Sequence, residues 1–130
     1  MLNLSSMNVQ SNSKIGSEGE QLACDFLLSR GHQILDRNWR VGHLELDIVS
    51  EAPDGVHFVE VKARTAPVTS MLSDQVNSLK QKRISAAALQ YLHKKHLEPS
   101  EVFFDIVSVL FDGPETKVRY FPQAWIPMYY

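Results

Sequence analysis

Two short segments of the chain place charged residues between apolar ones at the two-residue spacing of a β-strand. Residues 44–49 (LELDIV) carry Asp47, and residues 58–62 (FVEVK) carry Glu60 and Lys62. Successive side chains on a strand point to opposite faces, so Glu60 and Lys62 share one face of the second strand. Burying carboxylates between apolar residues is costly without a compensating cation. If the strands are adjacent, Asp47, Glu60 and Lys62 predict a divalent-metal site with a lysine beside it, which is the chemistry of metal-dependent nucleases.

The residues around these segments indicate how the two strands meet. Residues 53–55 (Pro-Asp-Gly) are typical of a tight turn, so we expect an antiparallel hairpin. On the first strand, Leu44, Leu46 and Ile48 are expected to share the face opposite the acidic one. The alternative is a pair of half-exposed strands with a solvated acidic face, which is the favoured interpretation for Glu45 taken alone.

Composition indicates one globular domain. The chain has 130 residues, of which 44% are hydrophobic and 22% charged, and this length allows a substantial core. Its single cysteine, Cys24, allows no internal disulfide, which suits a reducing cytoplasm. No apolar run approaches the ~20 residues of a membrane span, and the first residues lack the pattern of a signal peptide. We therefore expect a cytoplasmic protein with no membrane partner.

The distribution of charge says more than the net charge of −2. Residues 56–95 contain seven basic and two acidic residues, a net charge of +5, so the rest of the chain carries −7. A basic segment around the second acidic strand suits a site that faces phosphates. A solvated basic helix face would give the same pattern.

The remaining sequence predicts the elements that must position these residues. Residues 1–15 are expected to be a disordered tail, followed by a single domain over residues 16–130. Ser17 and Glu20 form a capping box at the start of a helix, which Gly31 ends. Strands follow, then a long helix and two more strands, expected at residues 33–41, 44–49, 58–62, 74–95 (helix), 102–110 and 117–121. The order αβββαββ predicts an α/β fold with a mixed β-sheet flanked by helices.

Several motifs along the chain match known proteins when taken in order. Asp47 followed by Glu60-Val61-Lys62 matches the D-x(n)-(D/E)-x-K signature of the restriction-endonuclease-like superfamily, and the αβββαβ order matches its core. The chain resembles more closely the YraN-like family of small, uncharacterised bacterial proteins, which looks like a relative of archaeal Holliday-junction resolvases. The matching segments, within residues 14–122, are residues 16–20 with Ala23, 37–40, 45–49, 58–62 with Arg64, Lys80 with Arg83, and 104–107.

The resemblance implies further site residues. It implies that the carbonyl of Val61 joins the metal ligands and that Glu20 reaches the metal from the first helix, although the capping box alone also explains Glu20. It also exposes a departure, because similar sequences often have Arg where this chain has Phe103.

The chemistry of the site follows from its residue types. Asp47 and Glu60 are the candidate ligands of Mg²⁺ or Mn²⁺, which in proteins is held by one or two carboxylates. Lys62 would orient or help deprotonate the attacking water and screen negative charge; alternatively, it forms a simple ion pair with Glu60 or Asp47. In the fourth strand, Asp105 lies among apolar residues and is expected to have an ion-pair partner.

Three basic residues are candidates for contact with nucleic acid. Lys80 and Arg83 are three apart on a helix and so share a face, and Arg64 follows the second acidic strand. Such side chains hold the phosphate backbone and do not read bases.

The sequence thus predicts a Mg²⁺-dependent, structure-selective DNA endonuclease acting on branched DNA. A homodimer would be needed for paired cuts at a symmetric junction. The alternative is a non-catalytic module that binds nucleic acid or protein and keeps the nuclease fold.

Overall fold

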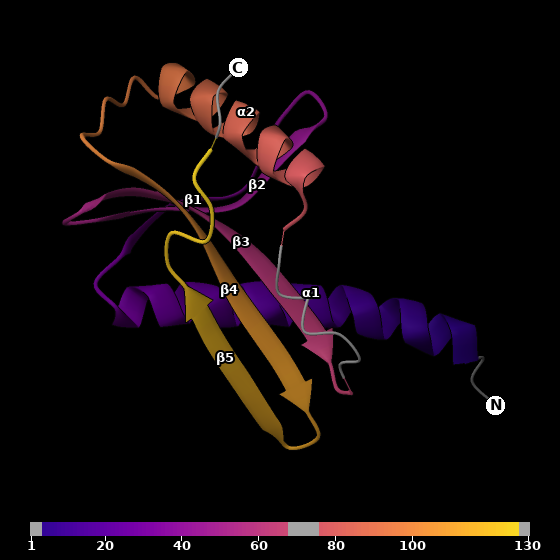
Figure 1. The fold of residues 1–130 in the computed structure, drawn as a ribbon. Coiled ribbons are helices and arrows are strands. Elements are labelled where there is room, and N and C mark those ends of the chain that lie inside the picture. Colours follow the sequence, from indigo (N-terminus) through magenta and orange to yellow (C-terminus); the bar gives the residue numbers. More distant parts are fainter. Residues whose placement is uncertain (1–3, 68–75, 128–130) are drawn as a thin grey trace.

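A five-stranded mixed sheet lies between two helices in the computed structural model, which describes residues 4–67 and 76–127, with side chains described from Lys14 onward (Figure 1). The order along the chain is αβββαββ, as predicted. The elements are α1 (Leu4–Ser29), β1 (Gln33–Val41), β2 (Leu44–Ala52), β3 (Gly55–Thr65), α2 (Ser78–Lys94), β4 (Val102–Asp112) and β5 (Glu115–Phe121). The fold class predicted from the sequence is therefore confirmed, and the architecture is consistent with a restriction-endonuclease-like core.

The strands lie in the sheet in their order along the chain, from β1 to β5. Neighbouring strands are antiparallel except β3 and β4, which are parallel. A parallel pair needs a crossover connection, and α2 is part of it. The predicted hairpin between β2 and β3 is confirmed. Its Gly55 is required, because its φ is +147° and an added Cβ would lie 2.3 Å from the carbonyl oxygen of Glu101.

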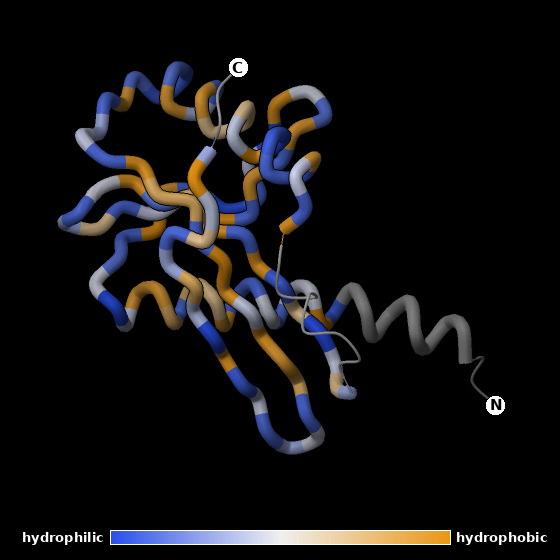
Figure 2. Tube along the Cα trace, viewed as in Figure 1, coloured by the Kyte–Doolittle hydropathy of each residue, from blue (hydrophilic) through white to orange (hydrophobic). Residues whose placement is uncertain are grey.

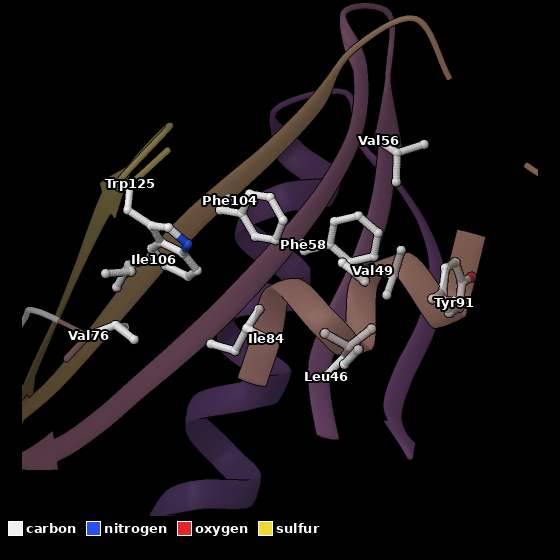
Figure 3. Packing of buried hydrophobic residues seen from close by; sticks show 12 residues of the cluster. Leu46, Val49, Val56, Phe58, Val76, Ile84, Tyr91, Phe104, Ile106 and Trp125 are labelled. Atoms are coloured by element: carbon white, nitrogen blue, oxygen red, sulfur yellow. The ribbon is translucent and has the colours of Figure 1, made fainter. Parts of the chain in front are cut away.

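The two helices cover opposite faces of the sheet, and each encloses its own cluster of apolar side chains (Figure 1). Figure 2 shows the hydrophobic stretches concentrated in the strands between the helices. The α2-side cluster, drawn in Figure 3, combines strand residues with the inner face of α2: Leu46, Val49, Val56, Phe58, Val76, Ile84, Ala87, Ala88, Tyr91, Phe104, Ile106 and Trp125. The α1-side cluster is smaller and consists of Ala23, Cys24, Leu27, Ile48, Val59, Val107 and Val109.

The start of α1 differs from the prediction. The helix begins at Leu4, so Ser17 lies inside it and does not cap it. Residues 4–15, assigned from the sequence to a disordered tail, are helical; they contain neither Pro nor Gly, so nothing in their sequence ends the helix. Residues 1–3 lie outside the described part of the chain. The other end is as predicted, with Gly31 at φ +88°.

The strands lie where they were predicted, β1 with the predicted bounds and the other four longer by two or three residues at one end or both. The predicted start of the second helix at residue 74 lies outside the described residues; α2 itself begins at Ser78, after the N-cap Asn77. β4 and β5 extend slightly beyond their predicted ends and form a hairpin that projects past the helices (Figure 1). Among the described residues, no helix is both long enough and apolar enough to cross a membrane.

Candidate active site

The alternation of side chains along β2 changes at Asp47. Leu46 belongs to the α2-side cluster, and Leu44 packs against that cluster, whereas Ile48 belongs to the α1-side cluster. The prediction that Leu44, Leu46 and Ile48 share one face is therefore wrong for Ile48. The regular pairing of β2 with β3 also ends here, with Ile48 opposite Val59 as its last pair. Asp47 thus lies where β2 separates from β3 while staying paired with β1. At this point the alternation of side chains between the two faces of β2 also shifts.

The side chain of Asp47 takes the place of a backbone acceptor at this point. Its Oδ2 accepts a hydrogen bond of 2.9 Å from the backbone N–H of Val61 on β3. This bond gives the backbone N–H of Val61 an acceptor and holds the carboxylate of Asp47 against β3, close to the carboxyl group of Glu60. The structure therefore brings Asp47 and Glu60 together, as their strand positions predicted.

Burial and the neighbouring Glu60 together raise the pKa of Asp47 to about 7. Burial is the main cause, because it penalises the charged carboxylate, and the negative charge of Glu60 adds to it. The hydrogen bond from Val61 and the charge of Lys80 act in the opposite direction without outweighing them. A pair of adjacent, buried carboxyl groups that resists full ionisation is a site that a multivalent cation would stabilise.

Glu60 is the more deeply buried member of the pair, with a side chain only 6% exposed. Its Oε1 forms an ion pair of 2.5 Å with Nζ of Lys80, which reaches it from the first turn of α2. The sequence analysis placed Lys80 among the contacts to DNA, and this contact with Glu60 was not predicted. Local sequence patterns could not predict this ion pair, because it depends on how α2 packs over β3.

The donor set of this site suits a hard divalent cation. Asp47 and Glu60 supply two carboxylates, and the predicted third ligand, the carbonyl of Val61, belongs to the residue whose N–H binds Asp47. Within the described residues, no group of three or more His, Cys, Asp and Glu side chains lies close enough to hold a metal ion. Mg²⁺ needs no such group, because it commonly binds one or two carboxylates and keeps several waters.

The carboxylate of Glu20 is bound by two residues of β1. Its Oε1 accepts hydrogen bonds from Nε of Arg37 at 3.1 Å and from Nδ2 of Asn38 at 2.7 Å, both on β1. It therefore forms no capping box, and its observed partners belong to β1 rather than to the Asp47–Glu60 pair. The close packing of α1 on the sheet depends on the neighbouring Gly19, where an added Cβ would come within 2.4 Å of the Cβ of Ala63.

Basic side chains follow Glu60 in successive rows across the sheet, on the face that α2 covers. In the first row, Lys62 of β3 lies opposite Ser108 of β4, which lies opposite Arg119 of β5. The next row places Arg64 and Lys117 on either side of β4. Arg64 also donates a hydrogen bond of 3.2 Å to Oγ of Ser108. Arg119 and Lys117 were missed by the sequence analysis, because only the register of the sheet places them beside Lys62 and Arg64.

The basic residues of α2 differ in their surroundings. The side chain of Lys80 is 48% exposed and bound to Glu60, whereas Arg83, three residues further along the helix, is exposed. Of the three predicted phosphate contacts, the structure places Lys80 at the carboxylate pair and Arg64 beside Ser108, whereas Arg83 lies on the exposed surface of α2.

A second buried charged cluster lies near the opposite end of β3. Asp105 accepts hydrogen bonds from Nδ1 of His57 at 2.6 Å and from the hydroxyl of Tyr120 at 2.5 Å. Nε2 of His57 reaches Oδ1 of Asp54 at 2.7 Å. Burial would lower the pKa of His57, but its hydrogen bonds to the two carboxylates outweigh burial and raise it. The prediction that Asp105 is paired is confirmed.

Phe103 belongs to this second cluster. Its ring stacks on the imidazole of His57, with ring centroids 4.6 Å apart and an angle of 21° between the planes. The departure from Arg at this position therefore concerns the His57 cluster, and not the surroundings of Asp47 and Glu60.

Comparison with known proteins identifies the family. Residues 19–109 match the model of "Uncharacterised protein family UPF0102". The chain belongs to the UPF0102 family. It is 37% identical over 116 residues to the UPF0102 protein of Trichlorobacter lovleyi, covering 88% of this chain and 91% of that protein. It is 38% identical over 110 residues to the UPF0102 protein of Myxococcus xanthus, covering 85% and 87% of the two chains.

The family match spans both acidic strands, α2 and most of β4, so Asp47, Glu60, Lys62 and Lys80 all lie inside it. The predicted resemblance to this group of small bacterial proteins is thereby confirmed at the level of the family.

Proposed function

We propose that this UPF0102 protein is a divalent-metal-dependent endonuclease that hydrolyses phosphodiester bonds in branched DNA. The observation that carries the proposal is the adjacent pair of carboxyl groups, half-buried Asp47 and buried Glu60, with the pKa of Asp47 raised to about 7. A structural role alone gives no reason to place two acids against each other inside a sheet, since like charges destabilise a buried site. The fold, consistent with a restriction-endonuclease-like core, supports the same assignment.

Each residue of the site has a role in this proposal. Asp47, Glu60 and the carbonyl of Val61 would hold Mg²⁺ or Mn²⁺, which when bound neutralises phosphate oxygens and lowers the pKa of water. Lys62, on the same face of β3 as Glu60, orients the attacking water and stabilises negative charge that develops on the phosphate. A part for Glu20 at the metal stays a prediction; in this structure Arg37 and Asn38 hold its carboxylate.

The proposed substrate class rests on basic residues of β3, α2 and β5. Arg64, Arg83, Lys117 and Arg119 offer point charges and guanidinium groups to the phosphate backbone, which positions nucleic acid without reading its sequence. A nuclease that reads no bases must gain its selectivity from the shape of the DNA, and a branched structure supplies that shape. A single site cuts one strand, so paired cuts at a symmetric junction require a two-fold symmetric dimer.

Gel cleavage of four DNA substrates tests the proposal. The four-way junction, flap, single strand and linear duplex are incubated with Mg²⁺ or Mn²⁺, with EDTA as a control. We expect nicking of the branched substrates, and we expect Lys62→Ala to abolish cutting while DNA binding at low salt persists. Lys94→Ala, a change at an exposed lysine in the last turn of α2, is the matched control and should cut normally.

The second candidate is a non-catalytic module that binds nucleic acid or protein. The observation that favours it is the ion pair between Glu60 and Lys80, which already supplies a cation to the buried carboxylates. In that case no substrate is cut under either metal, or cutting survives Lys62→Ala and comes from a contaminant.

A further inference from the structure

We propose that Lys80 is a resident counter-ion of the Asp47–Glu60 pair, and that a divalent cation displaces it when the site is loaded. The inference rests on the proposed metal site and assigns Lys80 a role in that site. Binding of the metal and release of the Lys80 ammonium are then one event, which leaves a cation beside the metal that can contact a phosphate.

The first support is the contact itself. Nζ of Lys80 lies 2.5 Å from Oε1 of Glu60, so the ammonium and the carboxylate are in direct contact. Asp47 and Glu45 also lie close enough to act on the charge of Lys80. The ammonium therefore occupies the electrostatic position that a cation between the two carboxylates would take.

The second support is the unequal burial of the two partners. The side chain of Glu60 is 6% exposed, whereas that of Lys80 is 48% exposed. A buried carboxylate needs a cation at all times, because an uncompensated buried charge is strongly destabilising. The half-exposed lysine has no such need and can turn into water at little cost. Only the cation of this pair is exchangeable.

The third support is the position of Lys80 on its helix. It lies in the first turn of α2, where its backbone N–H donates to the side chain of the N-cap Asn77. Backbone N–H groups give this end of a helix a partial positive charge, which favours acidic residues and disfavours a lysine. The first turn of α2 contains no acidic residue. The carboxylates of the sheet, and not the stability of the helix, therefore account for a lysine here.

Charge balance favours the exchange. Once Asp47 ionises, two carboxylates face one ammonium and one negative charge is left unbalanced, whereas a divalent cation balances both. The same linkage acts in both directions, because two ligands that exclude each other weaken each other's binding equally. Removing the charge of Lys80 should therefore tighten metal binding, and adding metal should expose the Lys80 amine.

Titration calorimetry with Mn²⁺ tests the first consequence. The full-length protein is compared with Lys80→Met, which removes the charge and keeps the apolar stem, and with Lys94→Met as the matched change in the last turn of α2. We expect Lys80→Met to bind Mn²⁺ on the order of tenfold more tightly than the parent. Lys94→Met should bind with the parent's affinity.

Acylation of lysines tests the second consequence in the unmodified protein, so the test does not depend on how a variant folds. Brief treatment with N-hydroxysuccinimidyl acetate, followed by peptide mass spectrometry, measures the reactivity of each amine with and without Mg²⁺. We expect Mg²⁺ to raise acetylation of Lys80 severalfold and to leave Lys94 unchanged. In Glu60→Gln, Lys80 should be reactive from the start and insensitive to Mg²⁺.

The outcomes separate the two proposals. If the parent binds Mn²⁺ while Lys80→Met binds it no more tightly and Mg²⁺ leaves the acetylation of Lys80 unchanged, the exchange is wrong and the metal site stands. If the parent binds no Mn²⁺ and the acetylation of Lys80 ignores Mg²⁺, both the exchange and the metal site are wrong.

Discussion

Glu60 on β3 and Asp105 on β4 are both buried acids of neighbouring strands, 5% and 0% exposed, and their surroundings differ. Both carboxylate oxygens of Asp105 are used: Oδ2 accepts from His57 and Tyr120, and Oδ1 accepts from the backbone N–H of Gln123 at 2.8 Å. Glu60 instead faces a second carboxyl group, that of Asp47, and is compensated by one half-exposed lysine.

The difference separates a structural acid from a functional one. A buried polar network whose members are all satisfied fixes the positions of the elements that it joins. Asp105 joins β4 to the β2–β3 turn through His57 and to β5 through Tyr120. Two acids placed together raise the free energy of the folded protein until a cation arrives, an arrangement typical of catalytic sites.

The largest effect should follow from removing Asp105. In Asp105→Ala, His57, Tyr120 and the N–H of Gln123 lose their acceptor inside the protein, which should cost about 3–5 kcal/mol of unfolding free energy. Urea denaturation measures it. The matched control is Asp112→Ala, which breaks an exposed pair with Lys117 at 3.5 Å and should change stability by less than about 1 kcal/mol. Equal losses in the two variants would contradict the structural role of Asp105.

A smaller effect, dependent on pH, should follow from Asp47→Asn. The pKa of Asp47 rises from 3.8 to about 7 on folding, so between these values the folded protein holds a proton that the unfolded chain has released. Stability of the parent must then fall as the pH rises through this window, by up to a few kcal/mol. Asp47→Asn lacks this loss, so its stability relative to the parent should increase from pH 4 to pH 7.

Unfolding curves in EDTA at several pH values measure the difference in stability between the parent and Asp47→Asn. The histidines titrate alike in both proteins, so their contributions cancel to first order. Parallel pH profiles for the parent and Asp47→Asn would mean that Asp47 is ionised normally in the folded protein.

The smallest effect on stability is expected for Glu60→Gln. The change removes the like charge beside Asp47 and also the partner of Lys80, so the two effects offset each other to within about 1 kcal/mol. Binding of Mn²⁺ should be lost at the same time, because the change replaces one of the two proposed carboxylate ligands with a neutral amide. Thermal unfolding and calorimetry measure the two quantities. A large drop in melting temperature would instead make Glu60 a structural member of an ion pair.

The features of the Asp47–Glu60 site that depend on local sequence patterns could be predicted. Alternation in β2 and β3 places Glu60 and Lys62 on one face, the Pro53–Gly55 turn makes those strands a hairpin, and together they bring Asp47 to Glu60. Local alternation does not predict that β2 changes phase at Asp47, because the change comes from the separation of β2 from β3 and not from the residue types.

Contacts between distant elements could not be predicted. The ion pair of Lys80 with Glu60 depends on the placement of α2, and the side-chain partners of Asp105 come from β3 and β5. For Glu20, the predicted capping box is wrong, because the packing of α1 against β1 gives its carboxylate Arg37 and Asn38 as partners. The role at the metal that the family resemblance implies stays a prediction.

Anomalous diffraction from crystals soaked with Mn²⁺ tests the central claim most directly. We expect a single strong manganese peak between the carboxylates of Asp47 and Glu60, next to the carbonyl of Val61. We also expect Nζ of Lys80 to have moved away from Glu60. The absence of manganese between Asp47 and Glu60 in the soaked crystals, with Lys80 still bound to Glu60, would contradict the proposed metal site.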